Sequence, residues 1–164
     1  MFPAMANHCA PRRTRTAATA TAVSAMLALP VLIALPANAA SSGDPTTRVL
    51  ELTNAGRAQA GCGELTRDAR IDEAAESYAK DMESSGRFSH DGADGSDFSD
   101  RLEKQGYSKP GGENIAQGQG SADAVMDAWM NSAGHRKNIL DCSFTTIGIG
   151  HADGQDYWVQ DFGR

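Results

Sequence analysis

The sequence predicts an α+β domain in which helices precede an antiparallel hairpin. Apolar side chains recur at helical spacing from Ile71 to Met82, after Asp68, which can cap the helix. Near the C-terminus, residues 145–151 and 157–162 alternate in the manner of strands, and an Asp-Gly turn separates them. Helices followed by antiparallel strands are typical of α+β layers.

The remaining elements are indicated by their caps and breakers. A first helix is expected over 45–60, because Asp44 can cap it and the proline that follows suits a first helical turn. A short helix is predicted for about 97–105. A third long helix should follow the capping Ser121 and be broken by Gly134.

The first 39 residues are predicted to be a secretory signal peptide. Three arginines precede an uncharged apolar stretch, 22–35, that is too short for a comfortable membrane span, and an Ala-Asn-Ala cleavage pattern ends at Ala39. An uncleaved anchor is the alternative. The expected organisation is therefore a signal peptide over 1–39, a linker over 40–47 and one domain over 48–164.

The charge balance excludes some partners. The chain has 15 basic and 21 acidic residues, and three of the basic ones precede the expected cleavage site, which leaves 12 against 21. Such an acidic chain is unsuited to nucleic acid or an anionic membrane. We expect an exported monomer, secreted or associated with the cell wall, that has no stable membrane span after cleavage.

Two cysteines, Cys62 and Cys142, remain after the signal peptide. Because an exported protein meets oxidising conditions, we predict that they form a disulfide. A bridge that closes a loop of about 80 residues would contribute roughly 4–5 kcal/mol as an upper figure. Two free thiols are the alternative.

Two histidines and a glutamate stand in strongly marked contexts. His90 lies in a Phe-Ser-His-Asp stretch, and Glu113 opens the expected short strand 113–117 in a Gly-Glu-Asn-Ile-Ala stretch. His135 follows the third long helix in Asn-Ser-Ala-Gly-His. The chain has four histidines in all, so this is the arrangement best suited to chemistry.

Together these motifs resemble the CAP superfamily, which covers cysteine-rich secretory, antigen 5 and pathogenesis-related proteins, and the compact bacterial form resembles the chain most. The resemblance spans about 48–164 and implies an α-β-α sandwich with a small antiparallel sheet between helical layers. The residues that carry it are Asn54, Arg57, Phe88, Ser89, His90, Gly112 to Ala116, Trp129, Asn131 to His135, Asn138 to Leu140, Gly148 to Gly150 and Tyr157 to Gly163.

The resemblance also implies a cleft built from two histidines and two glutamates. His90, Glu113 and His135 match three of these positions, and Asn114 stands beside them. The second glutamate falls on Ser132, a departure shared by bacterial-type members. It removes a carboxylate and so weakens any two-carboxylate mechanism.

Several chemistries remain open for this constellation. Two neutral imidazoles can bind Zn²⁺ weakly, with Glu113 orienting one of them or acting as a base. In the structural alternative, His90 and His135 are both hydrogen-bonded to that carboxylate. A nucleophilic role for Ser89 or Ser132 is disfavoured, because neither lies in a Gly-x-Ser-x-Gly motif.

Other polar residues are expected to be structural. Arg57 should pair with a carboxylate, and Asn138 should satisfy backbone groups near the His135 turn. His151 is expected at the surface. The acidic stretch 91–100 lacks the calcium-loop pattern and is expected to be a solvated loop.

Two functions follow from these observations. The first is a secreted protein that acts by extracellular binding of a lipid, glycan or protein partner. The second is a metal-assisted hydrolase of peptide or cell-wall bonds, in which His90 and His135 hold the metal and Glu113 is the base.

Overall fold

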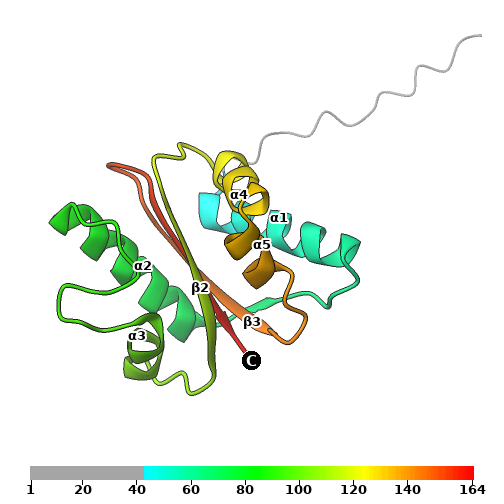
Figure 1. Cartoon of the computed structure of the whole chain (residues 1–164), viewed down its shortest axis with the longest axis horizontal. Coiled ribbons are helices and arrows are strands. Elements are labelled where there is room, and N and C mark those ends of the chain that lie inside the picture. Colours follow the sequence, from blue (N-terminus) through cyan, green and yellow to red (C-terminus); the bar gives the residue numbers. More distant parts are fainter. Residues whose placement is uncertain (1–42) are drawn as a thin grey trace, which may run out of the picture. The chain divides into compact units, whose positions relative to one another are not determined.

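The computed structural model describes residues 43–164, so the predicted signal peptide lies outside the described residues. Five helices and four strands make up this part of the chain (Figure 1). In chain order they are α1 (Pro45–Gln59), β1 (Thr66–Arg67), α2 (Ala69–Ser85), α3 (Phe98–Lys104), β2 (Pro110–Gln117), α4 (Ala122–Asn131), α5 (Ala133–Ile139), β3 (Thr146–Ala152) and β4 (Tyr157–Gly163). The first helix begins inside the segment 40–47 that was expected to be a linker.

The predicted α-β-α sandwich is confirmed. The strand order is β1-β3-β4-β2; β4 is antiparallel to both β3 and β2, and the two-residue β1 runs parallel to β3. Figure 1 shows α2 and α3 on one side of the sheet and α1, α4 and α5 on the other. The short β1 was not predicted from the sequence, because two residues carry too little alternation.

Side chains of β3 and β4 alternate between the two faces of the sheet, and each face packs against one helical layer. Ile147 and Ile149 pack in the core on the α1 side. Gly148 and Gly150 face α2, and a β-carbon at either position would collide with the helix backbone at Ile71 or Ala75. The glycines therefore allow α2 to lie against the sheet more closely than any other residue would allow.

Capping side chains start the helices where the sequence predicted. Asp68 accepts a hydrogen bond from the Arg70 amide, and Ser121 accepts one from the Ala124 amide. Asp97 and Asp100 form a reciprocal capping box at the start of α3. Each of these contacts satisfies an amide that has no partner within its own helix.

The third long helix ends earlier than predicted. Its last residue is Asn131, and the extended backbone of Ser132 separates it from α5, which contains Gly134. The break was wrongly placed at the glycine, whereas a serine with φ −99° and ψ 123° makes it. No helix among residues 43–164 is long and apolar enough to cross a membrane.

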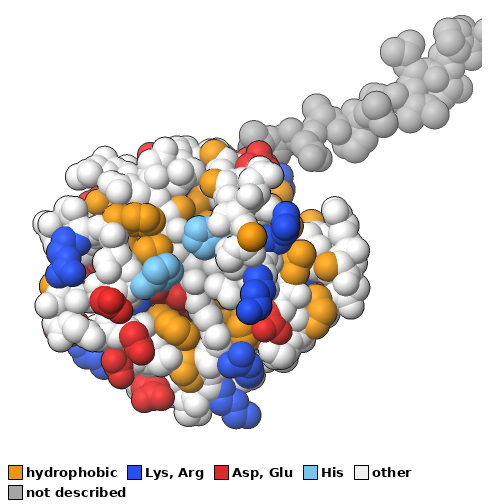
Figure 2. Space-filling view, in the orientation of Figure 1, with side chains coloured by type: hydrophobic (Ala, Val, Ile, Leu, Met, Phe, Trp, Pro, Cys, Tyr) orange, Lys and Arg blue, Asp and Glu red, His pale blue; other side chains and the backbone are white. Residues whose placement is uncertain are grey.

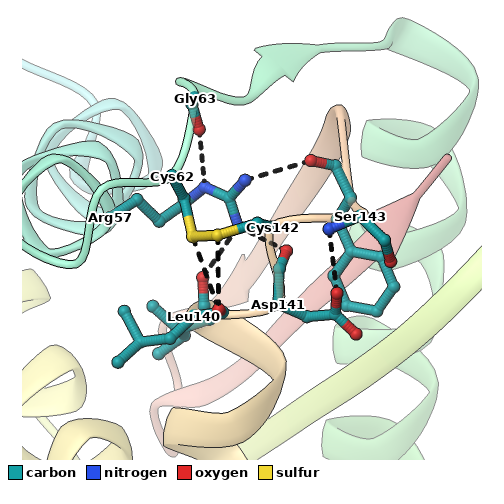
Figure 3. The surroundings of a disulfide bond; sticks show 9 residues. Arg57, Cys62, Gly63, Leu140, Asp141, Cys142 and Ser143 are labelled. Atoms are coloured by element: carbon teal, nitrogen blue, oxygen red, sulfur yellow. Dashed lines mark hydrogen bonds between the residues drawn. A yellow bond between two sulfur atoms is a disulfide. The ribbon is translucent and has the colours of Figure 1, made fainter.

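The predicted disulfide between Cys62 and Cys142 is confirmed, and it lies beside the buried side chain of Arg57 (Figure 3). The prediction that Arg57 pairs with a carboxylate was wrong. Its guanidinium, in a side chain that is 1% exposed, donates instead to backbone carbonyls at 2.9–3.0 Å. These carbonyls belong to Gly63, Ile139, Asp141 and Phe144.

The chemistry of a helix end explains this arrangement. The last carbonyls of α5 and of the loop after it have no partner within the helix, and a buried carbonyl needs a donor. One guanidinium has enough N–H groups to serve all four acceptors. Arg57 therefore binds α1 to the end of α5 independently of the disulfide.

Candidate functional site

The centre of the candidate site is a hydrogen bond between His90 and Glu113. Nδ1 of His90 lies 2.7 Å from Oε1 of Glu113. The glutamate side chain is 2% exposed, whereas the histidine side chain is 58% exposed. A buried carboxylate on β2 therefore holds an imidazole at the surface. Because Nδ1 is engaged, the ring nitrogen on the opposite side, Nε2, is the one presented outward.

Arg101 on α3 occupies the second oxygen of the same carboxylate. Its Nη2 lies 2.6 Å from Oε2 of Glu113 and also donates to the carbonyl of His90 at 3.2 Å. The guanidinium stacks on the ring of Tyr78 at 3.5 Å, and the Tyr78 hydroxyl donates to the carbonyl of Ser89 at 2.6 Å. Two consecutive carbonyls of the histidine loop are thus held by hydrogen bonds from Arg101 and Tyr78. Arg101 was not predicted from the sequence, although a buried glutamate needs a cation and the short helix contains one.

His135 reaches the site from the other helical layer. Successive residues of β2 point to opposite faces, so Glu113 faces α2 and α3, while Asn114 faces α5 and donates to the carbonyl of His135 at 3.2 Å. Because β2 is an edge strand, side chains from both layers can meet across it. Figure 2 shows histidine side chains near the middle of the face on which β2 lies, with acidic side chains beside them.

The two imidazoles have opposite electrostatic surroundings. The hydrogen bond to Glu113, with its negative charge, raises the pKa of His90 above the ordinary value. Burial, and then the positive charge of His90, lowers the pKa of His135. The pKa values of the two rings are therefore displaced in opposite directions, upward at His90 and downward at His135. We call His90, Glu113 and His135 the histidine surface.

A neutral network supports the histidine surface on the α5 side. Asn138 donates to the Asn114 side chain at 2.9 Å and to the Glu113 carbonyl at 3.1 Å. Asn114 donates to Gln160 at 3.0 Å, and Gln160 donates to Thr53 at 2.8 Å. Asn138 therefore serves the β2 backbone, whereas the sequence analysis expected it to serve the turn at His135.

Other predicted residues lie at varying distances from this centre. Ser132 is partly buried at the junction of α4 and α5, and its side chain makes no capping bond there. The oxygens of Glu113 are bonded to His90 and Arg101, and no hydrogen bond joins His135 to this carboxylate within residues 43–164. The structural alternative, in which both histidines bond to Glu113, therefore applies to His90 alone. His151 is 13% exposed and stacks on Trp158 at 3.7 Å, so its prediction as a surface residue was wrong.

A second carboxyl group, Asp161 on β4, was also missed by the sequence analysis. It is directly opposite Glu113 in the strand register and is fully buried. Burial, and then the negative charge of Glu113, raises the pKa of Asp161 well above its ordinary value, against the opposing influence of Arg101. The alternation of β4 could have identified it, because 157, 159 and 161 share the buried face toward α2.

A cavity of about 360 Å³ adjoins the histidine surface, between α2, the 91–96 loop and α3. Arg101 and Tyr78 belong both to its wall and to the support of the histidine loop. Its lining presents polar and apolar surface in similar amounts and includes three aspartates. The lining residues are Ala74, Ser77, Tyr78, Asp81, Gly92, Ala93, Asp94, Ser96, Asp100, Arg101, Lys104 and Gln105.

The fold and the site together define a class of protein: a three-layer α-β-α domain whose edge strand carries a buried glutamate that holds a surface histidine. The sequence matches the family described as CAP, the cysteine-rich secretory protein family, over residues 50–162. The chain belongs to this family.

Similar proteins are known from several bacteria. The uncharacterized Bacillus subtilis protein YkwD is 43% identical over 117 residues, which are 70% of this chain and 45% of YkwD. An extracellular Bacillus anthracis protein containing an SCP domain is 34% identical with a TM-score of 0.69, and the match covers 72% of this chain and 39% of that one.

An outer surface protein of Borrelia burgdorferi shares the fold at 21% identity and a TM-score of 0.67, with 73% of this chain and 92% of that one covered. The chain spans less than half the length of YkwD.

Proposed function

We propose that this protein is secreted and acts by binding an extracellular partner through the histidine surface and the adjacent cavity. One observation carries the proposal: both oxygens of Glu113 are engaged, one by His90 and one by Arg101. A carboxylate held in this way shapes a surface and presents an imidazole. Acting as a general base would require it first to release a strong, charge-assisted hydrogen bond.

Two observations support an extracellular location. The Cys62–Cys142 disulfide is a bond that persists in oxidising compartments. The similar Bacillus anthracis protein with an SCP domain is described as extracellular. The predicted signal peptide over 1–39 would direct this chain to the same side of the membrane.

The chemistry of the cavity favours a glycan or polypeptide over a lipid. Hydroxyl, carboxylate and amide groups, among them Ser77, Asp81 and Gln105, line it. Such groups accept hydrogen bonds from sugar hydroxyls and from peptide N–H groups. An acyl chain would instead desolvate the aspartates of the lining without offering them a hydrogen bond. Cell-wall material contains both kinds of partner and is the first material to test.

The binding proposal is tested by quantifying the retention of the purified protein on isolated bacterial cell walls, on a glycan array and on lipid vesicles. A His90→Ala, His135→Ala double variant should lose at least tenfold in affinity. The Lys137→Ala variant, which changes an exposed residue of the helix that carries His135, should bind like the parent. Equal retention of all three proteins would overturn the proposal, and retention on vesicles alone would assign the partner to lipids.

A metal-assisted hydrolase is the second candidate function. It is favoured by the His90–Glu113 pair, because a carboxylate on Nδ1 is the usual outer partner of a metal-binding imidazole and directs Nε2 to the metal. His90 and His135 would hold the ion weakly, since no group of three or more metal-ligating side chains occurs within residues 43–164. A bound zinc ion would supply Lewis acidity and an activated water.

Calorimetric titration with Zn²⁺ tests the second candidate. Heat released by the parent, and absent from the His90→Ala, His135→Ala variant, would establish the metal site. A screen of peptide and cell-wall substrates would then compare the parent with Glu113→Ala. Identical titration traces for the parent and the double variant would exclude the metal, and hydrolysis unaffected by Glu113→Ala would exclude the glutamate from catalysis.

A further inference from the structure

Asp161 lies at the centre of the sheet and is sealed from water. Its strand, β4, has neighbours on both sides, with Glu113 opposite on β2 and Gly148 opposite on β3. The backbone of α2 runs directly over Gly148, so no side chain separates the helix from the sheet at this point. Asp161 consequently has no exposed surface at all.

The two neighbouring carboxyl groups differ in their partners. Glu113 accepts from an imidazole at 2.7 Å and from a guanidinium at 2.6 Å. Neither oxygen of Asp161 has a hydrogen-bond donor among the described residues. Charged donors stabilise the ionised form of a carboxyl group, and burial without donors stabilises the neutral form. The two groups are thus driven toward opposite ionisation states.

We propose that Asp161 is an uncharged carboxylic acid in the folded protein at neutral pH and acts as a positioning residue for the histidine surface. By holding a proton it leaves one negative charge in the pair, on Glu113, which Arg101 and His90 then share. This role of Asp161 is separate from partner binding and does not depend on which partner the protein binds.

The groups around Asp161 favour this assignment over the reverse one. From β2 comes the negative charge of Glu113, and from α3 comes the positive charge of Arg101, which is already bonded to that glutamate. α2 contributes Tyr78, whose ring the guanidinium covers, and β3 contributes the uncharged Gly148. A proton on Glu113 instead would deprive both His90 and Arg101 of their charged acceptor.

This ionisation state makes folding depend on pH. An aspartate in the unfolded chain loses its proton near pH 4, whereas the raised pKa of Asp161 keeps the proton in the folded state. The folded state then binds one more proton than the unfolded state. Its stability is fully present below about pH 4 and declines as the pH rises, until the folded carboxyl group also ionises.

Urea unfolding between pH 5 and pH 8 tests this prediction with the parent and Asp161→Asn, whose amide is a permanently uncharged counterpart of the acid. We compare the two proteins by the unfolding constant of the parent divided by that of the variant. As the pH is raised, this ratio should increase about tenfold per pH unit until the pH reaches the pKa of Asp161 in the folded protein. The Asp127→Asn variant removes an exposed carboxylate and should follow the parent. A ratio between parent and Asp161→Asn that does not change with pH would overturn the proposal.

NMR titration of His90 gives an independent readout of the charge on Asp161. If Asp161 is uncharged, Asp161→Asn leaves the titration midpoint of His90 unchanged, whereas Glu113→Gln lowers it. A clear fall of the His90 midpoint in Asp161→Asn would show a charged Asp161 and would overturn the proposal.

Should Asp161→Asn fail to fold, the carboxyl-carbon resonance of Asp161 in the parent decides the matter. It should keep the chemical shift of a protonated acid at pH 7. The shift of a carboxylate at that pH would contradict the inference.

Discussion

The two faces of the sheet solve the burial of polar side chains in different ways. On the face toward α1, α4 and α5, Asn114 and Gln160 are neighbours across β2 and β4 and belong to an uncharged network. On the face toward α2 and α3, the next residues of the same strands, Glu113 and Asp161, place two carboxyl groups side by side. One step along each strand changes an amide pair into an acid pair.

This difference assigns separate roles to the two faces: one supports the position of β2, and the other sets the charge state around the histidine. The amide network is linked by hydrogen bonds of 2.8–3.0 Å, and none of its members titrates near neutral pH. The acid pair has unequal partners, so its charge depends on its surroundings and on pH. We infer that the α5 side fixes where β2 lies, while the α2 side sets the electrostatic character of the histidine that β2 presents.

The largest expected loss of stability comes from removal of the disulfide, which lies on the α5 side of the sheet. Replacing Cys142 by serine, together with Cys62→Ser, should lower the free energy of unfolding by about 4 kcal/mol, because a loop of about 80 residues is no longer closed in the unfolded chain. The Arg57 contacts should still hold the end of α5, so the histidine titrations should stay unchanged. Urea unfolding and NMR measure the two quantities, and altered titrations would show that the faces are not independent.

The variant Gly148→Ala should disrupt the packing of α2 on the face of the sheet that contains Glu113 and Asp161. The β-carbon of alanine would collide with the backbone of α2 at Ile71 and Asp72, so we expect a loss of about 3 kcal/mol or more. Gly134→Ala in α5 is the matched control, because its added β-carbon meets no atom within 4 Å and alanine favours helix. Comparable stability of the two variants in urea would contradict the close packing of α2.

A smaller loss is expected from Asn114→Ala on the supporting side. The variant leaves the Gln160 and Asn138 side chains without their partner and should cost about 2 kcal/mol. Because no titrating group is involved, the loss should be the same at pH 5 and pH 8. A loss that grows with pH would show that the network is coupled to the acid pair.

The smallest effect in energy is also the sharpest test of the comparison. In an NMR titration, His90 should have its midpoint above the ordinary histidine value and His135 should have its midpoint below it. The stability due to protonated His90 is present below about pH 6.5 and is lost as the pH rises through its raised pKa.

His135 contributes in the opposite sense. Its stability contribution is present above about pH 6.5 and is lost as the pH falls toward its lowered pKa, because the buried ring resists protonation. Two midpoints that coincide would show that Glu113 does not distinguish the rings.

Much of the fold could be predicted from the sequence, because its signals are local. The capping aspartates, the period of α2 and the Asp-Gly hairpin each depend on a few consecutive residues. The alternation of isoleucine and glycine in β3 also predicted two different faces. The two-residue β1 and the break at Ser132 escaped prediction, since neither has a local pattern of its own.

The candidate site could be predicted only in part. His90 and Glu113 stand in marked motifs, and their contact was one of the expected alternatives. Arg101 and Asp161 lie in segments that look ordinary, and their importance arises from cross-strand register and from the packing of α3. Register depends on residues far apart in the chain, which a reading of single segments does not provide.

The glycine at position 148 has an effect beyond its own strand. By letting the α2 backbone rest on the sheet, it excludes solvent from the carboxyl group across the ladder at Asp161. A bulkier residue there would lift the helix, hydrate that group and return it to ordinary acidity. Asp161 thus keeps its proton because residue 148 has no side chain. Substitutions in β3 would therefore change the surface chemistry of this domain while every residue of the histidine surface remained in place.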